Sequence, residues 1–140
     1  MLLIGIDPGV KTGVAVWDHR KQQFTHIRTE SIVTALAFCL EQNERGGIEI
    51  WFEDARQRTW FDQAGREQLQ GAGSIKRDCG IWQEFCEFYQ IPYRAIKPAK
   101  GGTKWNADFF KRVTGWPERT SEHSRDAAVL VFQRKPTSMD

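Results

Sequence analysis

The sequence has few cysteines, and their pattern excludes two classes of protein. Only three of its 140 residues are cysteine, and no two of them form a CxxC pair. An odd count without such pairs argues against a disulfide framework and against a zinc site. We therefore expect Cys39, Cys79 and Cys86 to be packing residues of a protein in a reducing, cytoplasmic compartment.

Long hydrophobic runs are also absent. No apolar stretch is long enough to cross a membrane, and the first residues lack the basic start and the small-residue cleavage site of a signal peptide. We expect no membrane partner. The hydrophobic fraction of 40% and the charged fraction of 27% are those of an ordinary globular protein. A chain of this length is large enough for one domain with a buried core.

The excess of positive charge is small, but the basic residues are clustered. The net charge is only +2, yet residues 94–112 contain six basic residues and one acid. Residues 56–77 contain five basic residues and two acids. Clustered positive charge is typical of a surface that binds phosphate groups. The alternative is a solvated surface on which the clustering is accidental.

The pattern of apolar residues predicts an α/β fold. Strands are expected at residues 2–7, 13–17, 22–28, 48–53 and 93–97. Helices are expected after the N-cap Ser31, over residues 67–89, after the N-cap Asn106 and after the N-cap Ser121. A meander followed by alternating helices and strands implies a mixed five-stranded sheet with helices on both faces. The domain is expected to span residues 1–134, with a disordered tail at residues 135–140.

The first candidate for a functional residue is Asp7. This acid ends an apolar strand and is followed by a turn at Pro8 and Gly9, so the segment is expected to form a hairpin with a carboxylate at its mouth. Burying a carboxylate is costly unless it is paired or binds a metal. The alternative is that Asp7 only caps the turn.

Three further residues are expected to lie near Asp7. Glu53 ends another strand, and parallel neighbouring strands bring their carboxyl ends to one edge of a sheet. His123 and Asp126 are three positions apart in the last helix and share one face of it. Four such ligands can converge on a divalent metal, and the hard carboxylates among them suit Mg²⁺ or Mn²⁺. Two such ions about 4 Å apart support phosphodiester cleavage. His123 is either a ligand, a general base or a solvated residue.

The other acids also have alternative interpretations. Glu53 can be an exposed residue at a strand end, and its neighbour Asp54 competes with it as the ligand. Asp126 can pair with a nearby arginine, either Arg119 or Arg125, without any metal.

Several motifs resemble those of one known family. IGIDPGVKTGVAV and HSRDAAVLVF resemble the first and last motifs of the RuvC family of Holliday junction resolvases, within the ribonuclease H-like superfamily. GAGSIKRDCGIW is similar to the family's long helix, and IKPAKGGTKWNADFFKRV to its basic segment. The resemblance covers about residues 3–132. It implies a ribonuclease H-like fold and a homodimeric endonuclease that cuts four-way DNA junctions with Mg²⁺, two ions per subunit, with Mn²⁺ able to substitute.

The resemblance also implies roles for individual residues. Asp7, Glu53 and Asp126 are expected to be metal ligands, His123 a ligand or a residue that positions water, and Lys104 a lysine of the catalytic site. The residues expected to bind DNA are Arg56, Arg58, Trp60, Phe61, Lys76, Arg77, Lys97 and Lys100. The two aromatic residues are expected to stack on bases at the opened junction, or alternatively to pack beneath their own loop. The short chain suggests a phage or prophage member, working in the cytoplasm of a bacterium or of an infected host.

Three other functions compete with this interpretation. KTGVAVWD and DAAVLVFQ also resemble the YqgF-like nucleases that act on ribosomal RNA precursors, although Glu53 at a strand end and the lysine-rich segment favour a resolvase. A non-catalytic protein that binds branched DNA would require one acid of the site to be non-functional, and no acid is missing. The actin-like sugar kinases need two such domains, for which this chain is too short. The segment GGTK lacks the spacing of a Walker A loop.

Overall fold

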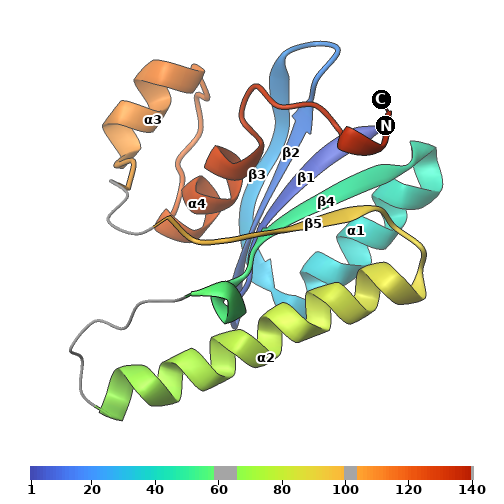
Figure 1. Cartoon of the computed structure of the whole chain (residues 1–140). Coiled ribbons are helices and arrows are strands. Elements are labelled where there is room, and N and C mark those ends of the chain that lie inside the picture. The colour runs from blue at the N-terminus through green and yellow to red at the C-terminus, as the bar shows by residue number, and fades with distance from the viewer. Residues whose placement is uncertain (59–65, 100–103, 140) are drawn as a thin grey trace.

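The structure is a computed structural model that describes residues 1–58, 66–99 and 104–139 (Figure 1). Predictions for Trp60, Phe61 and Lys100 lie outside the described residues. The strands are β1 (Leu2–Asp7), β2 (Lys11–Asp18), β3 (Gln23–Ser31), β4 (Ile48–Glu53) and β5 (Tyr93–Ile96). The helices are α1 (Ile32–Gly46), α2 (Arg66–Phe88), α3 (Ala107–Thr114) and α4 (Glu122–Val131), with short 3-10 turns at Ala55–Gln57 and Thr137–Met139.

The strands form one mixed sheet in the order β3-β2-β1-β4-β5. β1, β2 and β3 are an antiparallel meander, whereas β4 and β5 run parallel to β1. Helix α1 leads from the meander into β4, and α2 leads from β4 into β5. The predicted α/β fold with a five-stranded mixed sheet is therefore confirmed.

Apolar side chains alternate between two hydrophobic cores, one on each face of the sheet. Ile4 and Ile50 point to the face covered by α1 and α2, where all three cysteines are also buried. Leu3 and Trp51 point to the opposite face, covered by α4 and α3. Figure 1 shows the same division, with α1 and α2 on one side of the sheet and α3 and α4 on the other. The cysteines are unpaired and buried, as expected of packing residues.

Local signals along the chain predict the starts of α1, α3 and α4 correctly. Ser31, Asn106 and Ser121 each accept a hydrogen bond from a main-chain N–H in the first turn of the following helix. Such caps satisfy donors that the helix itself leaves unpaired. Among the described helices, none is long and apolar enough to cross a membrane.

Two predictions about the ends of elements are wrong. β2 begins before the expected residue 13 and β3 ends after the expected residue 28, because Lys11 and Thr12 pair with Ser31 and Glu30 at the end of the hairpin away from its turn. The tail is not wholly disordered, because Thr137–Met139 forms a 3-10 turn. The N–H groups of Thr137 and Ser138 donate to the buried carboxylate of Glu49, which holds the tail against the start of β4.

Candidate active site

Asp7 and Glu53 lie at the carboxyl edge of the two parallel strands at the centre of the sheet. Ile6 of β1 pairs with Phe52 of β4, so the next residue of each strand emerges at the same edge. Side chains alternate along a strand, and Leu3 and Trp51 both face α4. The residues at even spacing from them, Asp7 and Glu53, therefore face α4 as well.

Helix α4 approaches the sheet unusually closely because two strand residues lack side chains. A Cβ added to Gly5 would stand 2.1 Å from the carbonyl oxygen of Ala127, and one added to Gly13 would stand 2.0 Å from that of His123. Ser121, the N-cap of α4, also hydrogen-bonds Thr29 of β3. The first turns of α4 are thereby fixed over the ends of β1 and β2.

His123 and Asp7 form the first contact of the site. Nδ1 of His123 lies 3.0 Å from Oδ2 of Asp7, and the histidine side chain is about half exposed whereas the aspartate is largely covered. Burial raises the pKa of Asp7 from 3.8 to about 6. The hydrogen bond from His123 opposes this shift, and the negative charges of Asp126 and Glu53 add to it. The carboxylates of Asp7, Glu53 and Asp126 therefore act on one another at this edge, and we call these three residues the acidic group.

Glu53, rather than its neighbour Asp54, belongs to this group. Burial raises the pKa of Glu53, and the charge of Asp126 raises it further, while Lys104 and Arg58 oppose the shift. The side chain of Asp54 is held elsewhere: Nε and one terminal nitrogen of Arg56 donate to its two oxygens at 2.7 and 3.0 Å. These bonds lower the pKa of Asp54 although burial opposes them. Because side chains alternate along β4, Glu53 faces α4 and Asp54 does not, so Glu53 is the candidate ligand.

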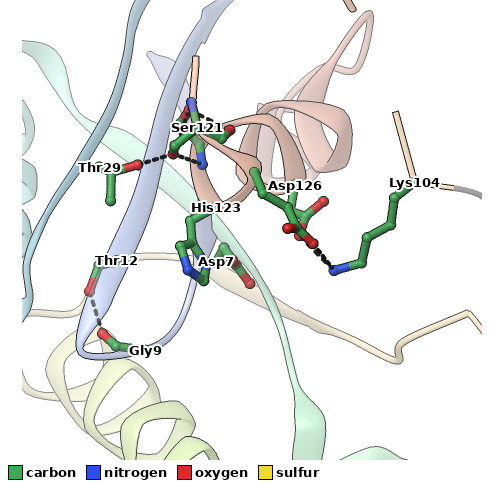
Figure 2. A network of polar contacts seen from close by, with 10 residues as sticks. Asp7, Gly9, Thr12, Thr29, Lys104, Ser121, His123 and Asp126 are labelled. Carbon is green, nitrogen blue, oxygen red and sulfur yellow. Dashed lines mark hydrogen bonds and ion pairs between the residues drawn. The ribbon is translucent and has the colours of Figure 1, made fainter. Parts of the chain in front are cut away.

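Lys104 joins the site from the segment before α3. Its Nζ lies 2.9 Å from Oε1 of Glu122 and 3.2 Å from Oδ2 of Asp126 (Figure 2). The hydrogen bond with Glu122 is the largest cause of a raised pKa of the lysine, and the bond with Asp126 adds to it. Sequence reasoning missed Glu122, although its position four residues before Asp126 places both acids on one face of α4.

The donor set suits a hard divalent cation, but its members are engaged with each other. Carboxylates are the ligands that Mg²⁺ and Mn²⁺ prefer in proteins, and the mutual repulsion of the three acids would be relieved by a cation. Within the described ranges, no three His, Cys, Asp or Glu side chains already form a complete ligand set. Figure 2 shows Asp7 beside His123 and Lys104 pointing at Asp126, so these side chains would have to turn to share an ion.

The residues predicted to bind DNA are in different situations. Arg56 is held by Asp54 and also donates to Gln83 at 2.6 Å, away from the acidic group. Arg77 donates to Ser74 and lies 3.9 Å from Asp78. Lys76 on α2 and Lys97 after β5 are exposed. The charge of Arg58 acts on Glu53, which connects this residue with the acidic group.

The sequence matches no protein-family model, and a search of curated proteins finds no significant match.

Proposed function

We propose that this protein is a divalent-metal-dependent endonuclease with a ribonuclease H-like fold that cuts branched DNA, with the four-way junction as its substrate. One observation carries the proposal: Asp7 and Glu53 lie at the carboxyl ends of adjacent parallel strands, facing the turn of α4 that bears His123 and Asp126. This is the arrangement that the motif resemblance implies for a two-metal nuclease. The mixed sheet with helices on both faces is consistent with it.

The metal ligands in this proposal are Asp7, Glu53 and Asp126, with His123 as a fourth ligand or as the residue that orients the Asp7 carboxylate. Bound Mg²⁺ would supply an activated water and stabilise the leaving oxygen of the phosphodiester. His123 already holds one oxygen of Asp7 and so restricts the rotation of that carboxylate. Lys104 brings a largely exposed ammonium group to the same place, where it can neutralise a phosphate.

The proposed partner is branched DNA, bound by a homodimer. Exposed Lys76 and Lys97 offer positive charge to the phosphate backbone. On α2, Ile75 is 42% exposed and Phe88 is 77% exposed, and the exposed apolar positions of this helix are the candidates for contact with a second copy of the chain. Sedimentation of the purified protein tests the dimer directly, since a monomer at all concentrations would exclude it.

The decisive experiment compares substrates with Mg²⁺ and with Mn²⁺. A four-way junction, a flap, plain duplex DNA and single-stranded RNA are incubated with the full chain, and the cut positions are mapped on each strand. Paired symmetric nicks in the junction are the expected result. Cleavage of RNA alone would favour a nuclease of ribosomal RNA precursors, and junction binding without any cleavage would favour a non-catalytic binding protein.

A matched pair of variants connects the activity to the site. Asp7→Asn is expected to abolish cleavage while leaving junction binding intact or stronger, because the variant loses a ligand and a negative charge near the phosphate. Asp108→Asn removes the same charge from an exposed position on α3 and should cut normally. Cleavage by Asp7→Asn at the normal rate would contradict the proposed metal site.

A further inference from the structure

We propose that Lys104 is an internal counter-ion that holds the place of the divalent cation at Asp126, and that Glu122 is the residue that tethers it there. This inference deepens the proposed function and rests on it for the assignment of Asp126 as a metal ligand. It adds an exchange: a cation that binds Asp126 displaces the lysine, and the displaced lysine becomes available to a phosphate.

Lys104 bridges two acids of α4, the solvent-exposed Glu122 and the partly covered Asp126. Its Nζ is 2.9 Å from Glu122 and 3.2 Å from Asp126. The side chains of Lys104 and Glu122 are 65% and 61% exposed, but that of Asp126 is only 24% exposed. The lysine thus reaches from solvent into the edge of the acidic group, where its charge stands close to Asp126.

The acidic group needs a positive charge at this position. The negative charge of Asp126 acts on both Asp7 and Glu53, so three carboxylates repel one another across the edge of the sheet. The charge of Lys104 counteracts this repulsion at Glu53 as well as at Asp126. The hydrogen bond from Nζ to Asp126 places this cation directly on a carboxylate of the group.

An ammonium group and a divalent cation compete for the same carboxylate oxygen. Binding of the cation at Asp126 therefore has to break the contact between Lys104 and Asp126. Glu122 lies one helical turn away and is not among the proposed ligands, so its contact with the lysine can persist and keep the ammonium group at the site. Cation binding then frees one contact of Lys104 for a phosphate, and phosphate binding in turn favours the cation, because such coupling is reciprocal.

The competition is tested by Mn²⁺ binding to the full chain without nucleic acid, followed by electron paramagnetic resonance. Lys104→Gln is expected to tighten Mn²⁺ binding roughly 3- to 10-fold, since a unit charge close to the ion is removed. Lys111→Gln removes the same charge from an exposed position on α3 and should change the affinity less than about twofold. In an Asp126→Asn background, the gain from Lys104→Gln should disappear.

Three results would overturn the competition. These are an equal gain from Lys111→Gln, a gain from Lys104→Gln that persists in the Asp126→Asn background, and no Mn²⁺ binding by the unmodified protein. Because no nucleic acid is present, the first two results are independent of whether the protein cuts DNA, whereas an absence of Mn²⁺ binding would also contradict the proposed metal-dependent nuclease.

The role of Glu122 in holding Lys104 at the site is tested by measuring junction binding with and without Ca²⁺. Ca²⁺ takes the place of Mg²⁺ so that binding is measured separately from cleavage. Ca²⁺ is expected to strengthen junction binding several-fold in the unmodified protein, and this enhancement should be lost in Lys104→Gln and reduced in Glu122→Gln. Glu118→Gln, an exposed acid in the loop before α4, is the matched control and should keep the enhancement. An undiminished enhancement in Lys104→Gln would refute the exchange. Failure of every variant to bind the junction would refute the proposed function and the coupling to phosphate, while the Mn²⁺ measurement would still decide the competition.

Discussion

Gly13 of β2 lies directly against the main chain of His123 in α4, so closely that a Cβ on the glycine would stand 2.0 Å from the histidine carbonyl oxygen. Gly5 of β1 has the same relation to Ala127 one turn further along α4. The obstructing atoms belong to the backbone, which cannot rotate away as the end of a flexible side chain can. The position of His123 over Asp7 therefore depends on two strand residues without side chains.

We expect Gly13→Ala to displace the first turn of α4. An added methyl group in such a contact costs typically about 1–3 kcal/mol of folding free energy, because the backbone has to shift. The displacement should also lengthen the contact between His123 and Asp7 and weaken Mn²⁺ binding. Urea unfolding and Mn²⁺ titration of the purified variant measure the two effects.

Gly46→Ala is the matched control for this substitution. No atom lies within 4 Å of a Cβ at Gly46, which ends α1. Alanine should change stability there by less than about 1 kcal/mol, and in the favourable direction where the residue is helical. If Gly13→Ala proved as stable as Gly46→Ala, the close approach of α4 to β2 would be wrong.

The raised pKa of Asp7 predicts a specific dependence of stability on pH. The group has a pKa of about 6 in the folded protein against 3.8 for an unfolded chain, so folding favours its protonated form. The stability that this preference contributes is fully present below pH 4 and is lost as the pH rises to about 6. The amide in Asp7→Asn does not titrate, so the variant keeps this stability at every pH. Relative to the unmodified protein, its free energy of unfolding should therefore rise by about 2–3 kcal/mol between about pH 4 and pH 6.

Urea unfolding at several pH values between 4 and 7, without divalent ions, measures this difference. Asp108→Asn, a substitution of an exposed acid, is measured beside it as the control. A difference between Asp7→Asn and the unmodified protein that stays constant with pH would contradict the burial of a charged Asp7. Addition of Mg²⁺ at pH 7 should stabilise the unmodified protein and leave Asp7→Asn nearly unchanged, because only a binding-competent site links the ion to folding.

The parts of this molecule that could be predicted from the sequence depend on neighbours along the chain. Ser31, Asn106 and Ser121 cap their helices through contacts three residues away, and strand β4 follows from an unbroken apolar run. The direction of Glu53 follows from the same local alternation once the covered face is known. These features need no knowledge of how distant segments meet.

The features that could not be predicted depend on how the chain folds back on itself. Lys104 and Glu122 are 18 residues apart, and nothing in either segment specifies that contact. Arg56 resembles a free cation in the sequence, yet the bend after β4 folds it back onto Asp54. The order of the tail is equally hidden, because its partner Glu49 is 88 residues away.

Arg56 and Lys76 are predicted alike as DNA contacts from the sequence, and the structure separates them. Arg56→Gln is expected to lower stability by about 1–3 kcal/mol, because it leaves the carboxylate of Asp54, which is only 4% exposed, without its charged partner. Lys76→Gln should change stability by no more than about 0.5 kcal/mol. Thermal or urea unfolding of the two variants measures this difference.

Junction binding at several salt concentrations completes the comparison. If Lys76 contacts a phosphate, its replacement should weaken binding and reduce the slope of log affinity against log salt by about 1. Arg56→Gln should leave that slope unchanged, since its guanidinium is already engaged by a carboxylate. A reduced slope for Arg56→Gln in folded protein would show that the ion pair opens to bind DNA.

Glu49 predicts that the last residues contribute to the stability of the sheet. This carboxylate is 1% exposed and accepts hydrogen bonds from the indole of Trp51 and from the main chain of Thr137 and Ser138. Although burial opposes them, these bonds lower the pKa of Glu49. Its contribution to stability is therefore present above the unfolded pKa near 4.5 and is lost as the pH falls through the lower folded value.

We expect Glu49→Gln to cost about 1–3 kcal/mol at pH 7, and removal of residues 137–140 to cost a similar amount, since each change leaves buried polar groups without partners. The two changes remove the same contacts, so the doubly altered protein should lose clearly less than the sum of the two single losses. Urea unfolding of the four proteins gives the coupling between the tail and Glu49. Strictly additive losses would mean that the tail does not bind Glu49, in agreement with the disorder that is expected of it from the sequence.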